Sequence, residues 1–270
     1  MNVSANLISR MRNRRRHGFT LIEILVASAV MALLVGLVIT ITSQVLNVWN
    51  RSGGRLSANQ EARIAMEMLT QDLETAVFRN RRSATDDSEW FFIEDSVISG
   101  SVNTVALNLF SPALDRPAGQ PGDICAITYE LRLVNPITGV NLPLSAAPAS
   151  QVQFVLYRQL IEPQQTFDSL LGGPITWGNP SADDYLVGNI VEFNIRLFRA
   201  NGQEITNNPF IFDGLPTTPV PAFADIKLRV LSPEGANILQ GQGSAANLDD
   251  IIREHATTFI RRVSFMNRPF

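Results

Sequence analysis

The spacing of hydrophobic and polar positions changes near residue 80 and divides the chain into a helical part and a strand-rich part. From Ile24 to Ile41 eighteen residues follow one another without a charge, which is about the length of a membrane-spanning helix. Apolar residues then recur in steps of three and four as far as Val77, the spacing of one buried helix face. We therefore predict one N-terminal helix over residues 19–79, in which 19–46 form a transmembrane anchor and 47–79 an amphipathic part lying on the remaining domain.

Gly53 and Gly54 are the weak point of this predicted helix. Two adjacent glycines cost about 2 kcal/mol relative to alanine in a helix interior. The pattern therefore leaves open whether the helix kinks or breaks there.

Residues 80–270 carry the pattern of a β-rich domain outside the membrane. Apolar and polar residues alternate from Ile190 to Phe198 and again from Ala224 to Leu231, as in half-buried antiparallel strands. Asn247 can cap a short helix over Leu248–His255, and proline- and glycine-rich loops separate the other segments. The fold class is thus α+β, a long helix packed on an antiparallel β-sheet, with strands predicted at Trp90–Ile93, Val105–Phe110, Cys125–Val134, Val152–Tyr157, Ile190–Phe198, Ala224–Leu231 and Thr257–Phe265.

The charge of the chain is distributed unevenly. Its 22 basic and 25 acidic residues nearly balance, but five arginines precede Gly18 with no acid among them. The residues after Gly18 keep 17 basic against 25 acidic side chains, a formal charge of −8, which argues against nucleic acid as a partner. Because positive flanks stay cytoplasmic, the arginines also place residues 1–18 in the cytoplasm and the domain on the outer side of the inner membrane.

Candidate chemistry is sparse. Cys125 is the sole cysteine, so neither an intramolecular disulfide nor a Cys-ligated zinc site is possible, and we expect this thiol to be buried. The chain has two histidines; His17 belongs to the leader, and His255 is interpreted as a surface residue. No nucleophile elbow, HExxH or phosphate-binding loop is present, so we predict no enzyme and no cofactor.

Two groups of charged residues leave alternatives open. Acidic clusters at 86–89, 183–184 and 249–250 could hold calcium, but none has EF-hand spacing, and solvated loop charge is the favoured interpretation. Arg261 and Arg262 belong to a basic C-terminus that could dock against an acidic neighbour. As adjacent residues of a strand they point to opposite faces and cannot form one patch.

Glu23 is the odd residue of the apolar run, because a carboxylate within such a segment costs about 2.5 to 3.5 kcal/mol even on lenient insertion scales. It needs either a partner or a position near the cytoplasmic headgroups, which its place near the helix end would allow. The residues around it are His17-Gly18-Phe19-Thr20-Leu21-Ile22-Glu23, preceded by the arginine block. This stretch resembles the processing motif of type IV prepilins and pseudopilins.

The resemblance implies a cleavage site, a modification and an assembly contact. In that family a prepilin peptidase cuts after the glycine, so residues 1–18 would be removed, and it methylates the new amino group, here that of Phe19. A free amine beside hydrocarbon carries a positive charge at neutral pH. Glu23 of one subunit could then neutralise the Phe19 amine of a neighbour, which is the pairing that a buried charge requires.

The size of the domain points to a minor subunit within this family. Leu69 to Arg79 resembles the end of the helix in J-type minor pseudopilins of type II secretion systems, and W-type minor pilins of type IV pili share the region of Asp72 about as well. We expect a structural subunit whose partners are prepilin peptidase and other pseudopilins or pilins in a fibre. The alternatives are a type IV pilus subunit and a signal-anchored extracytoplasmic binding protein. Ala27-Ser28-Ala29 could imitate the cleavage site of an ordinary signal peptide, but it lies too early in the apolar run.

Overall fold

The chain divides into two compact units, Met1–Asn50 and Arg51–Phe270. The computed structural model describes most of the second unit and the helical part of the first. The leader at 1–18 and the predicted cap Asn247 lie outside the described residues, which are 19–80, 89–98, 102–115, 118–119, 122–135, 141–142, 153–172, 175, 177–242 and 248–266.

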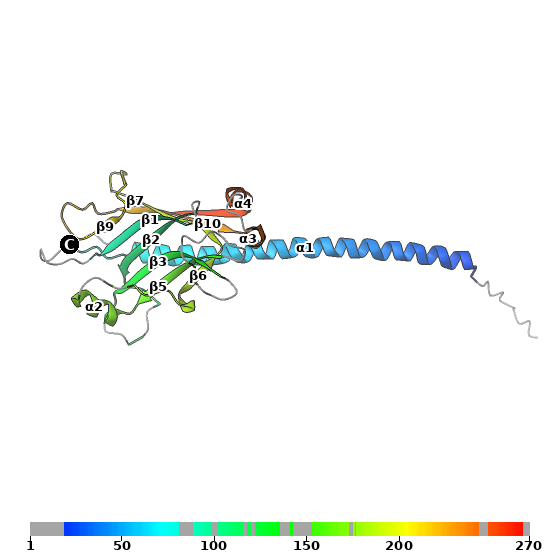
Figure 1. The fold of residues 1–270 in the computed structure, drawn as a ribbon, viewed down its shortest axis with the longest axis horizontal. Coiled ribbons are helices and arrows are strands. Elements are labelled where there is room, and N and C mark those ends of the chain that lie inside the picture. The colour runs from blue at the N-terminus through cyan, green and yellow to red at the C-terminus, as the bar shows by residue number, and fades with distance from the viewer. Residues whose placement is uncertain are drawn as a thin grey trace, which may run out of the picture. The chain divides into compact units, whose positions relative to one another are not determined.

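Helix α1 covers Leu21–Glu74 and contributes to both units (Figure 1). It continues through Gly53 and Gly54, so the two glycines do not break it. It ends five residues before the predicted end, because Val77 N donates to Phe110 O at 2.8 Å and leaves the helical hydrogen-bond ladder. In the second unit its buried face is formed by Ala62, Ala65, Met66, Leu69 and Leu73, spaced by three and four residues as one side of a helix requires.

The two glycines of α1 differ in their surroundings, and this difference gives a matched test. A Cβ atom on Gly54 would lie 2.9 Å from Cγ of Pro233, whereas one on Gly53 would meet nothing within 4 Å. We expect Gly53→Ala to stabilise the second unit by up to about 1 kcal/mol, the helix propensity difference. Gly54→Ala should not show this gain in stability, because its new methyl group would clash with Pro233. Thermal unfolding of the two variants measures the difference, and an equal rise in both would contradict the close approach of Pro233.

The described residues of the second unit form two antiparallel sheets, whereas the sequence analysis expected one. The larger sheet has the order β6-β5-β3-β2-β1-β9, with β4 paired to β3. Its strands are β1 (Phe91–Ile98), β2 (Val102–Ser111), β3 (Cys125–Val134), β4 (Asn141–Leu142), β5 (Gln153–Ile161), β6 (Tyr185–Gly188) and β9 (Phe210–Phe212).

The smaller sheet has the order β11-β10-β7-β8. Its core side carries the apolar residues of the predicted alternation, among them Phe193, Ile195, Ile226 and Leu228, all buried. The opposite side carries Asp225, Lys227 and Arg229, which are only partly buried. The strands are β7 (Ile190–Phe198), β8 (Glu204–Ile205), β10 (Phe223–Leu231) and β11 (Ala256–Ser264).

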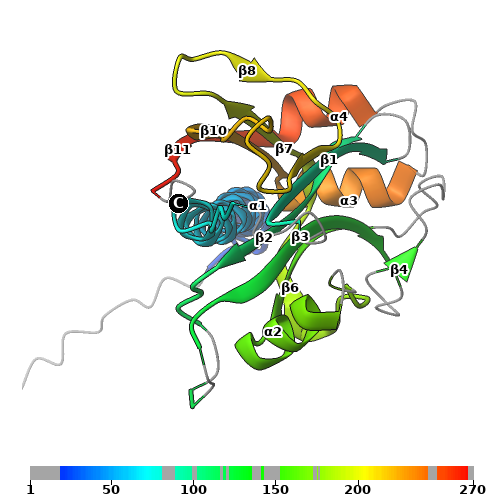
Figure 2. The same cartoon turned by 90° about the vertical axis from the view of Figure 1, so that its left-hand side faces the viewer.

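Short helices complete the second unit. They are α2 (Pro163–Gly172), η1 (Ala182–Asp184), α3 (Pro233–Gln242) and α4 (Leu248–His255), of which the sequence analysis assigned only α4. Figure 2 shows the part of α1 that belongs to this unit end-on, with strands of the two sheets on either side of it. The core lies where the helix and the sheets meet, and it includes Cys125, which is buried as expected. The α+β arrangement of a long helix on antiparallel β-structure is confirmed.

Candidate processing and assembly site

The start of α1 holds the residues that the sequence analysis singled out. Gly18 lies outside the described residues, and Phe19, the next residue, has 79 % of its surface exposed. Glu23 occupies the first turn of the helix. Gly18 and Phe19 are adjacent in the chain, but the structure of a single subunit does not bring Glu23 to a second subunit, so the roles of all three stay predictions.

Glu23 takes part in a local contact that the sequence analysis missed. Its backbone N–H donates to Oγ1 of Thr20 at 3.3 Å, and its Oε2 accepts from the backbone N–H of Thr20 at 3.5 Å. This reciprocal arrangement is a capping box, which satisfies N–H groups at a helix start that have no intrahelical acceptor. The spacing Thr20-x-x-Glu23 was its signal in the sequence.

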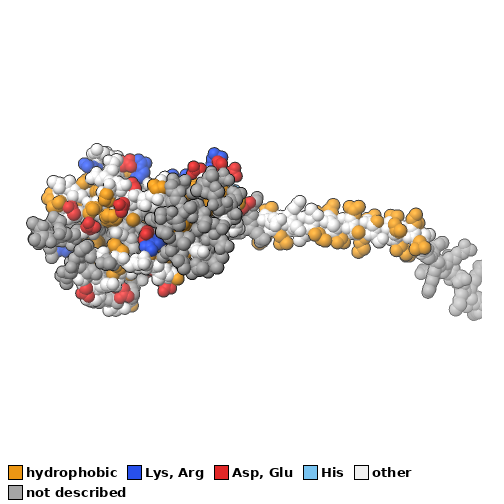
Figure 3. Space-filling model, in the orientation of Figure 1, with side chains coloured by type: hydrophobic (Ala, Val, Ile, Leu, Met, Phe, Trp, Pro, Cys, Tyr) orange, Lys and Arg blue, Asp and Glu red, His pale blue; other side chains and the backbone are white. Residues whose placement is uncertain are grey.

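The rest of the anchor presents apolar side chains to its surroundings. Within the first unit, residues 19–49 are exposed all along the helix, and the face visible in Figure 3 carries hydrophobic side chains throughout. The helix is long and apolar enough to cross a membrane. An apolar surface of this size is typical of a site of association with lipid or with other apolar helices.

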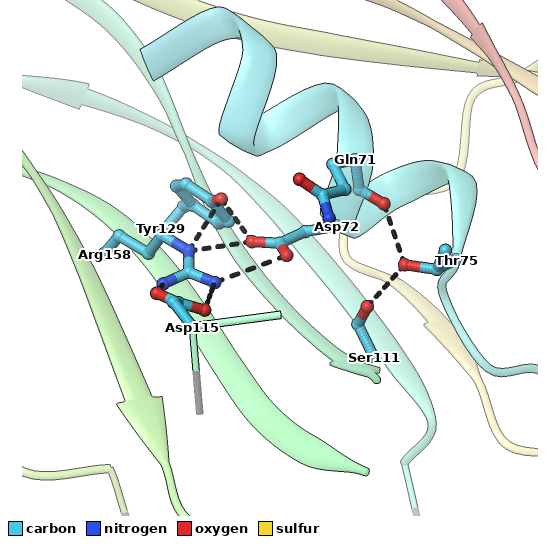
Figure 4. A network of polar contacts seen from close by, with 7 residues as sticks. All are labelled: Gln71, Asp72, Thr75, Ser111, Asp115, Tyr129 and Arg158. Carbon is cyan, nitrogen blue, oxygen red and sulfur yellow. Dashed lines mark hydrogen bonds and ion pairs between the residues drawn. The ribbon is translucent and has the colours of Figure 1, made fainter. Parts of the chain in front are cut away.

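A group of polar residues connects α1 to the larger sheet; Asp72, Tyr129 and Arg158 are buried, Asp115 is half-exposed, and the four are here called the helix clamp (Figure 4). Asp72 on α1 accepts from the Tyr129 hydroxyl of β3 at 2.5 Å and from Nε of Arg158 on β5 at 2.8 Å. The guanidinium also donates to Asp115 at 2.6 and 3.1 Å. The clamp therefore ties the helix, two strands and the turn after β2 together.

Electrostatics and burial keep the Tyr129 phenol and the Arg158 guanidinium of the clamp protonated. Burial raises the pKa of Tyr129 well above its ordinary value, and the Asp72 charge raises it further, so the phenol stays neutral and donates. Burial alone would lower the pKa of Arg158, but its hydrogen bond to Asp72 and the nearby charges outweigh burial and raise the pKa. The side chains of Asp72 and Arg158 are only 6 % and 7 % exposed, so each charge depends on the other for its stabilisation.

Beside the clamp, the hydroxyl groups of Thr75 and Ser111 lie 2.7 Å apart and link the residue that directly follows α1 to β2 (Figure 4). Thr75 Oγ1 also donates to the carbonyl of Gln71 at 2.8 Å. The end of the helix is therefore fixed to the sheet at two neighbouring points.

The C-terminal arginines point to opposite faces of β11, as predicted. Arg261 donates to Glu67 of α1 at 2.5 Å, whereas Arg262 pairs with Asp225 of β10 at 2.6 and 2.7 Å. The hydrogen bond from Arg262 lowers the pKa of Asp225. Both arginines therefore form ion pairs within the chain. Docking of this basic C-terminus against an acidic neighbour stays a prediction.

The other candidate residues have local roles. Asp184 accepts from Ser181 N at 2.6 Å in a second capping box, and Asp250 pairs with Arg253. Asp86 and Asp87 lie outside the described residues. Within the part of the chain that the structure describes, no three His, Cys, Asp or Glu side chains gather as metal ligands would. His255 lies at the end of α4, with Nε2 3.9 Å from Oε2 of Glu254.

Comparison with known proteins finds a sequence motif in the N-terminal segment. The prokaryotic N-terminal methylation motif matches residues 13–39, and these include Gly18, Phe19, Glu23 and much of the anchor. Among curated protein sequences none matches the chain. Among solved structures the chain is similar to a type IV-like pilin from Thermus thermophilus, at 10 % identity and a TM-score of 0.40, over 77 % of this chain and 95 % of that one. The methylation motif at the head of an apolar helix supports a pilin or pseudopilin role.

Proposed function

We propose that the chain is a structural minor subunit of a pilus-like fibre, made as a precursor with a leader at residues 1–18. Prepilin peptidase cuts between Gly18 and Phe19 and methylates the Phe19 amine, and the mature subunit enters the fibre through its helix. One observation carries the proposal: the methylation motif coincides with the start of α1. Residues 21–49 of this helix are exposed and hold one charged side chain, Glu23.

Residues 19–46 anchor the subunit in the inner membrane before assembly, and the domain lies on the extracytoplasmic side. The five leader arginines support this direction, because basic segments remain in the cytoplasm. Asn47 and Trp49 follow the anchor, and an indole with a polar neighbour suits the headgroup level.

Within this class we propose a pseudopilin of a type II secretion system, supported by the resemblance of Leu69 to Arg79 to J-type subunits. Deleting the protein in its source organism should then lower the yield of proteins secreted into the medium and leave pilus-driven motility intact. Loss of motility with normal secretion would instead assign it to a type IV pilus.

The mature N-terminus tests the proposal. Mass spectrometry of the chain purified from membranes should find Phe19 as the first residue, with one methyl group on its amine. Gly18→Val should leave the leader attached, because a branched side chain replaces hydrogen at the bond to be cut. Ala27→Leu is the matched control: it alters the competing site at Ala27-Ser28-Ala29 and should not change processing. An intact leader in the unaltered protein, or a cut after Ala29, would overturn the proposal.

A further inference from the structure

A polar pocket of about 240 Å³ lies in the second unit, where α1 runs past the end of β10 and the junction of α4 with β11. Arg55 and Asn59 of α1 form one wall, and Glu254, His255 and Thr257 form the other. Pro233, at the start of α3, packs next to this place against Gly54. The pocket is therefore built from segments far apart in the sequence and held by helix packing. Its volume suits a small polar group rather than a drug-sized ligand.

The side chains at the pocket carry both signs of charge. The Arg55 guanidinium is half-exposed, and its ion pair with Glu234 is 4.0 Å long, beyond hydrogen-bond length. The Glu254 carboxylate is also mostly exposed, 3.9 Å from Nε2 of His255. The Nδ1 atom of His255 is buried without a hydrogen-bond partner among the described residues. A ligand with an anionic and a cationic end matches this pair of opposite charges, since a guanidinium binds phosphate well.

The pocket is also close to the anchor along the chain. Arg55 follows Leu46, the last residue of the proposed anchor, by nine residues, and nine residues of fully extended chain span at most about 32 Å. The pocket therefore lies within that reach of the end of the anchor, whatever the arrangement of the two units. With the anchor in a bilayer, lipid headgroups are the most abundant phosphate groups at that level.

We propose that this pocket binds a phosphate ester that carries a primary amine, as in the headgroup of an aminophospholipid of the surrounding membrane. Arg55 holds the phosphate, and Glu254 accepts hydrogen bonds from the ammonium group. Bound lipid would fix the second unit at the membrane surface before the subunit enters a fibre. The inference rests on the proposed membrane anchoring of residues 19–46 but not on cleavage or assembly.

Native mass spectrometry of the full-length chain in detergent tests the binding, with added phosphatidylethanolamine, phosphatidylglycerol or phosphatidylcholine. We expect phosphatidylethanolamine to be retained best, because a quaternary ammonium donates no hydrogen bond and glycerol offers no positive charge. Arg55→Gln should weaken retention of phosphatidylethanolamine at least tenfold. Glu254→Gln should remove the preference for it over phosphatidylglycerol. The control is Arg253→Gln, which alters an exposed arginine of α4, next to Glu254 but outside the pocket. It should leave the retention of all three lipids unchanged.

The other outcomes are decisive as well. Equal retention by the unaltered chain and Arg55→Gln, with both folded by circular dichroism, would overturn the site. Soluble glycerophosphoethanolamine distinguishes the source of the ligand: if it binds while the intact lipid does not, the pocket takes a free phosphate ester and the membrane assignment fails. A chain that retains lipid but keeps its leader in the processing experiment would refute the proposed function and leave this site standing.

Discussion

Replacing Asp72 by alanine is expected to destabilise the second unit by about 3 to 5 kcal/mol, the cost of breaking a buried ion pair by removing one partner. The substitution leaves the Arg158 guanidinium, 7 % exposed, without the carboxylate that accepts from its Nε. It also takes the acceptor away from the buried Tyr129 hydroxyl. Asp115 still pairs with the other side of the guanidinium, which argues for the lower half of the range. Urea or thermal unfolding measures the loss.

Asp225→Ala is the matched control for this prediction. Asp225 also forms a two-point contact with an arginine, but Arg262 is 60 % exposed and Asp225 25 % exposed. Exposed pairs contribute about 0.2 to 1 kcal/mol, so this variant should lose several-fold less stability than Asp72→Ala. Equal losses in the two variants would contradict the assignment of the helix clamp as a buried, mutually dependent pair.

A combined replacement separates the charge of the clamp from its packing. Exchanging a whole buried ion pair for apolar residues of similar size is often neutral or stabilising. Asp72→Leu, Arg158→Met and Tyr129→Phe together should therefore recover most of the stability lost in Asp72→Ala. If the triple variant does not recover this stability, the hydrogen bonds of the clamp stabilise the second unit themselves, in addition to neutralising the buried charges.

The clamp also marks the limit of what the sequence could predict. Asp72 is 86 residues from Arg158 and 57 from Tyr129, and no local pattern relates positions so far apart. The alternation of β7 and β10 was readable because each strand has one face in the core and one outside. The sequence did not show that these two strands belong to a second sheet. Alternation indicates which face of a strand is buried, but it does not indicate which strands lie beside it.

Two of the missed helices did carry a local signal. Both α2 and α3 begin with proline, Pro163 and Pro233, and proline is favoured in the first helical turn because its missing N–H has no partner to lose there. Ser232 precedes Pro233, and its hydroxyl accepts from Gly235 N at 3.2 Å, as an N-cap does. Because each helix has only ten residues, its apolar spacing is too short to stand out from the loops around it.

The capping box at the start of α1 changes how the proposed role of Glu23 has to be tested. The sequence offered two interpretations of this carboxylate, a partner amine on a neighbouring subunit or a position at the headgroups. The structure adds a third, because Glu23 closes the first turn of its own helix through Thr20. A variant that removes the side chain alters both the cap and the charge, so one substitution alone cannot assign the role.

Glu23→Gln is therefore the decisive variant, and it is expected to reduce incorporation of the subunit into fibres at least a hundredfold. Glutamine can still complete a capping box, but it cannot neutralise the Phe19 amine of a neighbour. The loss of a charge pair in an apolar surrounding, about 3 kcal/mol or more, corresponds to such a factor. Membrane insertion should not suffer, since removing a carboxylate from an apolar segment lowers its insertion cost. Immunoblots of sheared fibres against membranes measure the incorporated fraction.

Thr20→Val provides the matched comparison, because it removes the hydroxyl that accepts from Glu23 N at 3.3 Å and leaves the carboxylate in place. Loss of an N-cap costs about 1 kcal/mol, so incorporation should fall no more than about fivefold. Resistance of the second unit to proteolysis should be the same in both variants, because neither residue belongs to that unit. If Glu23→Gln assembles normally and Thr20→Val does not, the carboxylate acts as a helix cap, and pairing with a neighbouring amine is ruled out as its role.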